Sequence, residues 1–176
     1  YMYAHLHDQL KTSKLSAKQI RDGWLHHIYS EEDAPLFQKF PNSKPLTENF
    51  LWLSNEQARK LMEKGMTTPE TSEPENNRYH MMIDAQLTTE IFGLLAPVRP
   101  DVAIDIAYLP VRATAKDDAE WISQFYIAMH SLASVVDKSL NIAEQTYWLA
   151  EKSSRYLPAN STPAKMYAFI KEHYLK

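Results

Sequence analysis

A chain of 176 residues with 44% hydrophobic residues and a formal net charge of −3 is long enough for one globular domain with a buried core. The absence of cysteine excludes disulfide scaffolds and thiol catalysis, and three glycines are too few for the glycine-rich loops that bind phosphates. No run of Lys or Arg exceeds a pair and no apolar run is long enough to span a bilayer, so we expect no nucleic-acid partner and no membrane. The compartment is left open.

Two helices are predicted at the start of the chain. The first runs from residue 1 to about residue 11, where apolar residues recur at every fourth position. The second follows a capping box in which Ser16 caps the helix and Gln19 reaches back to it, and it runs to about residue 28. Because the first helix is already under way at Tyr1, we expect these residues to be a segment of a longer protein.

An acidic, proline-containing connection at 31–44 and a short helix or turn at 46–53 come next. A second capping box, Ser54 with Gln57, predicts a helix that ends at Gly65. A long loop is then predicted for 66–77, with Asn76 and Asn77 as default helix caps. Long ordered loops in compact domains are often functional.

Residues 79–97 contain no Lys or Arg and are apolar on nearly every face when placed on a helix. We therefore expect a mostly buried helix in which Gln86, Glu90 and Gly93 share one face. A buried carboxylate is costly unless it is paired. Glu90 is thus either part of a structural network or part of a ligand pocket, and spacing alone favours the network.

The second half of the chain reads as four further helices. The first spans about 101–109 and ends at Pro110, and the second, the longest, is capped by Asp117 or Asp118. A third starts at Ser139 and a fourth at Thr162, where proline follows the cap. Apolar stripes on the longest and last helices are expected to be buried: Trp121, Phe125, Met129, Leu132 and Val136, then Met166, Phe169, Ile170 and Tyr174. Alternation typical of strands is absent, so residues 1–176 are expected to form one all-α domain.

Four stretches, in this order and spacing, resemble the ADP-ribosylglycohydrolase family. They are an early helix at 16–27, the segment IDAQLTTEIFGLLAP followed by RPDVA at 83–103, the aromatic and alanine-rich helix at 121–133, and LPANS at 157–161. Each motif is short, and the resemblance that they carry extends over most of the chain, from residue 16 to residue 161. The resemblance implies a compact orthogonal array of about seven or eight helices around a cleft, as the central part of a larger catalytic domain.

The resemblance also implies a function. Members hydrolyse the N- or O-glycosidic bond that joins ADP-ribose to a protein side chain or a small conjugate, with a pair of divalent cations, Mg²⁺ or Mn²⁺. The acidic metal motifs of the family, of the Thr-Asp-Asp and Asp-x-Asp-Thr types, are absent from this sequence, so we expect the metal ligands outside it and no activity from this segment alone. The family's central helix lines its cleft, which makes Gln86, Thr89 and Glu90 the expected substrate-binding residues.

One departure leaves the specificity open. Before Ala96-Pro97 the family commonly has Asn-Gly-x-x-Met-Arg, whereas this chain reads TEIFGL. The alternative to a hydrolase is a non-catalytic helical module that binds a nucleotide or a protein partner. A terpenoid-type metal enzyme would need a second Asp-Asp pair besides Asp117-Asp118, and the sequence has none. An HD-type metal enzyme would need paired His-Asp motifs, and His7-Asp8 is the only His-Asp dipeptide.

Overall fold

The computed structural model describes residues 2–28 and 51–174. Within these residues the chain forms eight α-helices and two 3-10 helices and no strand, which confirms the all-α class. Their bounds are α1 (Met2–Leu10), α2 (Ala17–His27), α4 (Leu53–Glu63), η1 (Glu70–Ser72), η2 (Ile83–Thr88), α5 (Glu90–Leu95), α6 (Pro100–Val111), α7 (Asp118–Leu132), α8 (Ile142–Ser154) and α9 (Thr162–Tyr174). The connection expected at 31–44 and most of the element expected at 46–53 lie outside the described residues.

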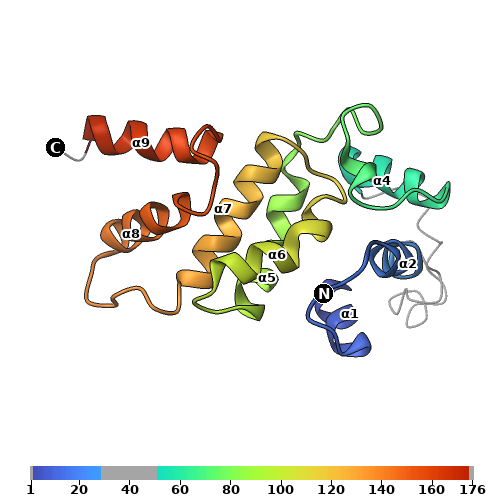
Figure 1. Cartoon of the computed structure of the whole chain (residues 1–176), viewed down its shortest axis with the longest axis horizontal. Coiled ribbons are helices and arrows are strands. Elements are labelled where there is room, and N and C mark those ends of the chain that lie inside the picture. Colours follow the sequence, from blue (N-terminus) through green and yellow to red (C-terminus); the bar gives the residue numbers. More distant parts are fainter. Residues whose placement is uncertain (1, 29–50, 175–176) are drawn as a thin grey trace, which may run out of the picture.

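The helices form three groups along the long axis of the molecule (Figure 1). Helices α1, α2 and α4 lie at one end, α5, α6 and α7 in the middle, and the α8–α9 hairpin at the other end. Helix α7 packs against α5, α6, α8, α9 and η2. None of the helices in the described ranges is long and apolar enough to cross a membrane.

The core lies between the first group and the middle group, and much of it consists of small side chains. Ala103 and Ala107 on α6 and Ala119 and Ala128 on α7 are at most 1% exposed. The buried side of α7 also carries Ser123, Gln124, Ile127 and Ser131. The stripe expected for α7 was therefore only partly right, since Leu132 and Val136 are buried whereas Trp121, Phe125 and Met129 are half-buried. Small residues on the facing side of α7 let neighbouring helices approach it closely, because the distance between packed helices depends on the side chains at the contact.

The two capping boxes expected in the first half have different outcomes. The box of Ser16 and Gln19 is formed, with both reciprocal hydrogen bonds in place. The prediction of a capping box at Ser54 is wrong. The N-cap of α4 is Trp52, and Ser54 lies in the first turn, where it is 1% exposed. Gly65 follows α4 with φ +97°, which confirms it as the residue that ends this helix in the left-handed region.

The α8–α9 hairpin departs from two expectations. Helix α8 is capped by Asn141 in a capping box with Glu144, whereas Ser139 bonds to Asp137. The apolar side chains of α9 were expected to be buried, but Met166, Phe169 and Ile170 are 59%, 54% and 41% exposed. Periodicity marks an apolar face, but only a neighbour covers it.

The long central helix expected at 79–97 is wrong: the segment is a turn-rich stretch followed by η2 and then the short α5. Thr88 and Thr89 lie at the break. Their hydroxyls donate to the carbonyls of Ala85 (3.1 Å) and Gln86 (3.0 Å), which are the carbonyls that backbone N–H groups would take in a continuous α-helix. Threonine hydroxyls thus compete with the helical backbone pattern at this point.

Candidate functional site

A groove of about 760 Å³ opens where η2 and α5 face the N-terminal helices. We call it the Asp84 groove. Much of its wall is apolar, and the side chains include Met2, Tyr3, Trp24, Leu87, Ile91 and Leu94. The polar side chains on it are Asn55, Asp84, Thr88, Glu90 and Thr114. A largely apolar concavity of this volume with a few polar groups is typical of a small-molecule site.

Asp84 is the unusual residue of this groove. It lies in the first turn of η2 and is 4% exposed. Both of its carboxylate oxygens are buried, and neither has a hydrogen-bond partner among the described residues. Buried polar atoms are nearly always bonded, and a carboxylate in apolar surroundings destabilises the fold unless donors meet it. The fold therefore leaves two acceptors unsatisfied at the wall of an open groove.

The groove is also negatively charged. Glu90, the exposed first residue of α5, lines it together with Asp84. None of the described residues that line it is Lys, Arg or His. Apolar walls concentrate the field of the two carboxylates. The groove thus favours a ligand with positive charge or hydrogen-bond donors over a phosphate.

The far wall of the groove is fixed by a short polar chain. The indole Nε1 of Trp24 donates to Tyr3 Oη at 3.0 Å, and that hydroxyl donates to the Pro110 carbonyl at 3.5 Å. Burial raises the pKa of Tyr3, so the phenol stays neutral. These bonds join α1, α2 and α6 and hold the aromatic wall in place.

The structure separates the three residues expected to bind substrate. Glu90 lines the Asp84 groove, but the expectation that its side chain is buried is wrong, because Glu90 is exposed. Thr89 is 1% exposed and its hydroxyl bonds to the Gln86 carbonyl, so Thr88 lines the groove instead. Gln86 lines a different groove. The break between η2 and α5 turns these side chains away from one another.

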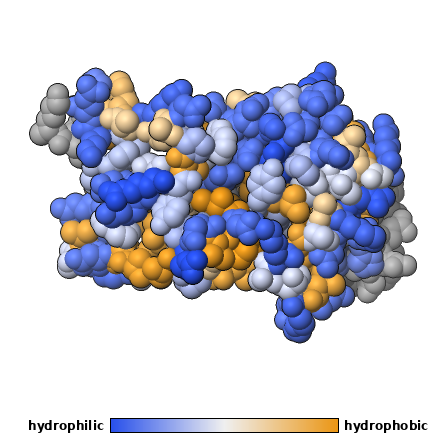
Figure 2. All heavy atoms as spheres, viewed as in Figure 1, coloured by the Kyte–Doolittle hydropathy of each residue, from blue (hydrophilic) through white to orange (hydrophobic). Residues whose placement is uncertain are grey.

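That second groove, the α7–α9 groove, also has a volume of about 760 Å³ and lies between α7, α8 and α9. Its wall is apolar and aromatic, and the hydroxyls of Tyr147 and Tyr167 meet across it at 3.0 Å. Burial and this hydrogen bond raise the pKa of Tyr167. In the space-filling view, apolar surface is exposed over α5 and the adjoining end of α7 (Figure 2).

A metal centre was expected to draw its ligands from outside these residues. In residues 2–28 and 51–174, no group of three or more His, Cys, Asp or Glu side chains is placed to hold a metal ion. Asp84 and Glu90 are the acids on the Asp84 groove, and two such residues are fewer than a typical divalent-cation site uses. The described residues therefore do not fit the dinuclear Mg²⁺ or Mn²⁺ site that the resemblance implies.

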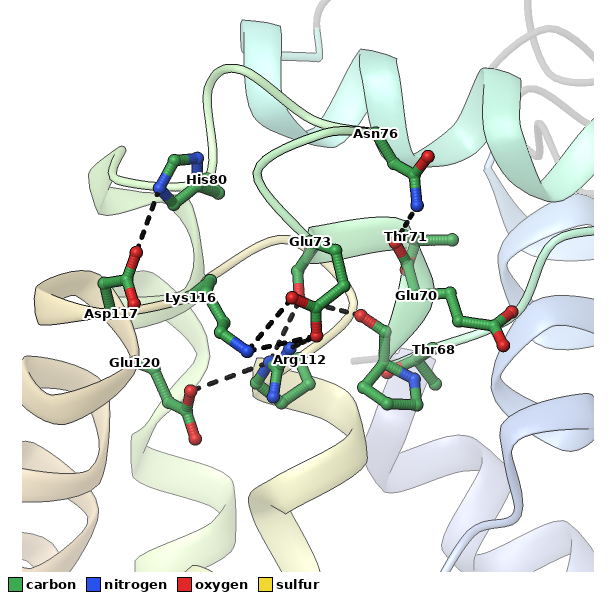
Figure 3. Close-up of polar contacts among 12 residues, drawn as sticks. Thr68, Glu70, Thr71, Glu73, Asn76, His80, Arg112, Lys116, Asp117 and Glu120 are labelled. Atoms are coloured by element: carbon green, nitrogen blue, oxygen red, sulfur yellow. Dashed lines mark hydrogen bonds and ion pairs between the residues drawn. The ribbon is translucent and has the colours of Figure 1, made fainter.

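A second polar cluster joins the loop before η2 to α6 and α7 (Figure 3). The Arg112 side chain is 5% exposed and pairs with Glu73 at 2.5 Å and with Glu120 at 3.6 Å. Lys116 pairs with the other oxygen of Glu73 at 3.0 Å, and Ser72 Oγ accepts a hydrogen bond from Arg112 Nε at 3.0 Å. Each of these charges faces an opposite charge, so the cluster stabilises the loop.

The pKa values of the two acids of this cluster, Glu73 and Glu120, are shifted in opposite directions. A hydrogen bond from Lys116, together with Arg112, holds the pKa of Glu73 below its usual value. Burial raises the pKa of Glu120, and the positive charges of Arg112 and Lys116 only partly offset that rise. The difference arises because Glu73 accepts direct hydrogen bonds from both cations, whereas Arg112 lies 3.6 Å from Glu120.

Sequence reasoning missed Asp84 as a site residue. On a continuous helix Asp84 was one of several polar positions interrupting an apolar stretch, and nothing in the spacing distinguished it. Its place in the groove depends on the break after Thr88, which changes the faces that the side chains before and after it occupy. The two threonines in succession, Thr88 and Thr89, are the signal that could have located this break.

Comparisons of the chain with models of protein families, with curated proteins and with solved structures found no match.

Proposed function

We propose that this chain is the helical part of an ADP-ribosylglycohydrolase-like hydrolase that cleaves an N- or O-glycosidic ADP-ribosyl linkage in a modified protein or a small conjugate. The order of the resembling motifs and the all-α fold support this proposal. The observation that carries it is the pair Asp84 and Glu90. Both acids belong to one of the resembling segments, 83–97, and both line one open groove.

Two carboxylates in an apolar groove suit the chemistry of glycosidic cleavage. The sugar gains positive charge as the bond breaks, in an oxocarbenium-like transition state. Negative charge in apolar surroundings stabilises such a cation more than it would in water. In this proposal Glu90 accepts hydrogen bonds from ribose hydroxyls, and Asn55 and Thr114 add uncharged polar contacts. The diphosphate lies outside the groove, because no described lining residue is a cation.

Divalent cations, if bound, would polarise the linkage and lower the pKa of a water molecule. The described residues do not themselves fit a metal centre. Under the proposal their ligands come from outside these 176 residues. Gln86 and Thr89 stay predicted substrate-binding residues, with Gln86 on the α7–α9 groove and the Thr89 hydroxyl bonded to backbone.

The test is an assay of the complete protein with an ADP-ribosylated protein and with small ADP-ribose conjugates, with and without Mg²⁺ or Mn²⁺. We expect metal-dependent release of ADP-ribose. Glu90→Gln should lower turnover, and a change below about threefold would count against a role for Glu90 at the site. Glu172→Gln is the matched control, because Glu172 is exposed on α9 and lines neither groove.

A non-catalytic helical module that binds a nucleotide or a protein partner is the second candidate. The exposed apolar side chains of α9 beside the α7–α9 groove favour it, since exposed apolar patches often mark interaction surfaces. Folded, helical protein that releases no ADP-ribose from any conjugate under any metal condition would favour this reading over the hydrolase.

A further inference from the structure

We propose that the Asp84 groove binds an organic primary ammonium ion with an apolar body, and that Asp84 receives the ammonium group. Such a site would exist whether or not the chain takes part in hydrolysis of ADP-ribose conjugates. The occupant is a small molecule with a slender cationic end and a hydrophobic remainder.

We infer that the ligand is positively charged because the groove that binds it carries an excess of negative charge. Asp84 and Glu90 line it, and no Lys, Arg or His is among its described lining residues. A ligand that brings one positive charge reduces this imbalance, whereas an anion increases it. Because Asp84 is only 4% exposed, little water screens its charge.

We infer that the ligand carries N–H donors because the two carboxylate oxygens of Asp84 lack hydrogen-bond donors in the described part of the chain. Neither Asp84 Oδ1 nor Oδ2 has a donor among the described residues, and a carboxylate can accept bonds at both oxygens. A primary ammonium group supplies three donors, whereas a quaternary ammonium supplies none. Both oxygens are buried on a residue that lines the groove, so a slender head group reaches them more readily than a trimethylated one.

We infer that the rest of the ligand is apolar because most of the rest of the groove wall is apolar. Trp24, Leu87, Ile91 and Leu94 contribute aromatic and aliphatic surface to the groove, and Leu87 and Leu94 are 59% and 72% exposed. A hydrophobic ligand body would cover part of this surface and gain free energy in proportion to the area removed from water. An aromatic ring joined to the ammonium by a short alkyl chain fits a volume of about 760 Å³.

The test uses isothermal titration calorimetry with three probes of the same body. They are 4-phenylbutylammonium, its neutral analogue 4-phenylbutanol, and its N,N,N-trimethyl derivative. We expect the primary ammonium to bind at least about tenfold more tightly than the alcohol and than the trimethyl derivative. Neither comparison involves ADP-ribose, so the result is independent of the hydrolase assay.

Two variants complete the test. Asp84→Asn should weaken binding of the primary ammonium at least about tenfold while leaving the affinity of the alcohol nearly unchanged. The same substitution removes an unpaired buried charge, so the ligand-free variant should melt about 2–4 °C higher than the wild type. Asp8→Asn is the control for both measurements, because the Asp8 side chain is 81% exposed and lines no part of the groove.

Several results would overturn the assignment. One is equal affinity of the wild type for the ammonium and the alcohol, or no binding of the ammonium at all. Another is unchanged ammonium binding in Asp84→Asn. A lower melting temperature of that variant would show that the carboxylate has a structural role, which also contradicts a binding function for its free oxygens.

Discussion

Gly93 on α5 lies directly against His130 on α7. A Cβ atom added at Gly93 would come within 2.3 Å of His130 Cβ and 2.8 Å of the Ser131 backbone nitrogen. Both neighbours belong to the helix at the centre of the molecule, so neither can move aside like the end of a flexible side chain. The glycine therefore sets how closely α5 approaches α7, and α5 in turn positions Glu90 and Ile91 on the Asp84 groove.

Gly93→Ala should destabilise the fold. Alanine normally favours a helix over glycine by about 1 kcal/mol, but the contact with α7 should reverse the sign and lower the free energy of unfolding by at least about 2 kcal/mol. Urea denaturation would measure this. Gly23→Ala is the comparison, because the added Cβ would meet the terminal Cδ1 of Leu6 at 2.5 Å, a flexible group, so its loss should be clearly smaller. Equal losses would show that the α5–α7 contact is not special.

Val98 is held in a backbone conformation that suits glycine. Its φ is +63°, a region costly for a β-branched residue, and its backbone N–H donates to the Ser131 carbonyl at 2.8 Å. Val98→Gly keeps that bond and relieves the strain, so the free energy of unfolding should rise by about 0.5–1 kcal/mol. The control is Val135→Gly, at a valine equally exposed (47% against 48%) and without positive φ. Val135→Gly should lower the free energy of unfolding. If Val98→Gly lowered it as well, the backbone strain at Val98 would be contradicted.

Arg112→Met should be among the more damaging single changes in the cluster of Figure 3. It leaves the buried Glu120 without the cation beside it and removes the bonds to Ser72 and Glu73. Breaking a buried ion pair from one side typically costs about 3–5 kcal/mol. Arg99→Met removes an exposed pair with Asp101 and should lower stability far less, because solvent screens exposed ion pairs. Thermal and urea denaturation of both variants would compare them, and similar losses would show that the Arg112 contacts add little.

Glu120→Gln should alter the pH dependence of stability in a defined direction. Burial raises the pKa of Glu120, so the folded state binds this proton more tightly than the unfolded chain. The penalty for ionising Glu120 is thus absent below the unfolded pKa and grows as the pH rises through the raised folded pKa. Relative to the wild type, the glutamine variant should gain stability between about pH 4 and about pH 7. Denaturation of both proteins at both pH values measures the difference in their free energies of unfolding. A difference that does not change with pH would contradict the raised pKa of Glu120.

Glu73→Gln should give the opposite sign. The lowered pKa of Glu73 means that its contribution to stability is present above the unfolded pKa and is lost as the pH falls through the lowered folded value. The variant should therefore be less stable than the wild type near about pH 7 and approach it as the pH drops below about 4. Urea midpoints across this range would show the convergence. A Glu73→Gln difference that did not shrink at low pH would contradict the ion pairing with Arg112 and Lys116.

The parts of the fold that follow local rules were predictable. The box of Ser16 and Gln19 and the end of α4 at Gly65 are each determined by a few neighbouring residues. Thr162, expected as the N-cap of the last helix, is instead the first residue of α9, and its hydroxyl donates to Asp118 Oδ1 at 2.6 Å. Ser54 shows the limit of such rules, because its spacing to Gln57 fits a capping box but the N-cap of α4 is Trp52, two residues earlier. The resemblance to a family, and the function it implies, stay predictions that the assays above would test.

The sequence by itself determined that the chain is helical, where several helices begin and end, and that an acid-containing apolar stretch lies at its centre. Tertiary structure decided which faces are covered and which acid lies unsatisfied at the groove. Local patterns specify hydrogen bonds within a few residues, whereas burial depends on neighbours distant in sequence. Asp84 and Glu90 share a groove because the hydroxyls of Thr88 and Thr89 interrupt the helix between them and because the N-terminal helices form the opposite wall.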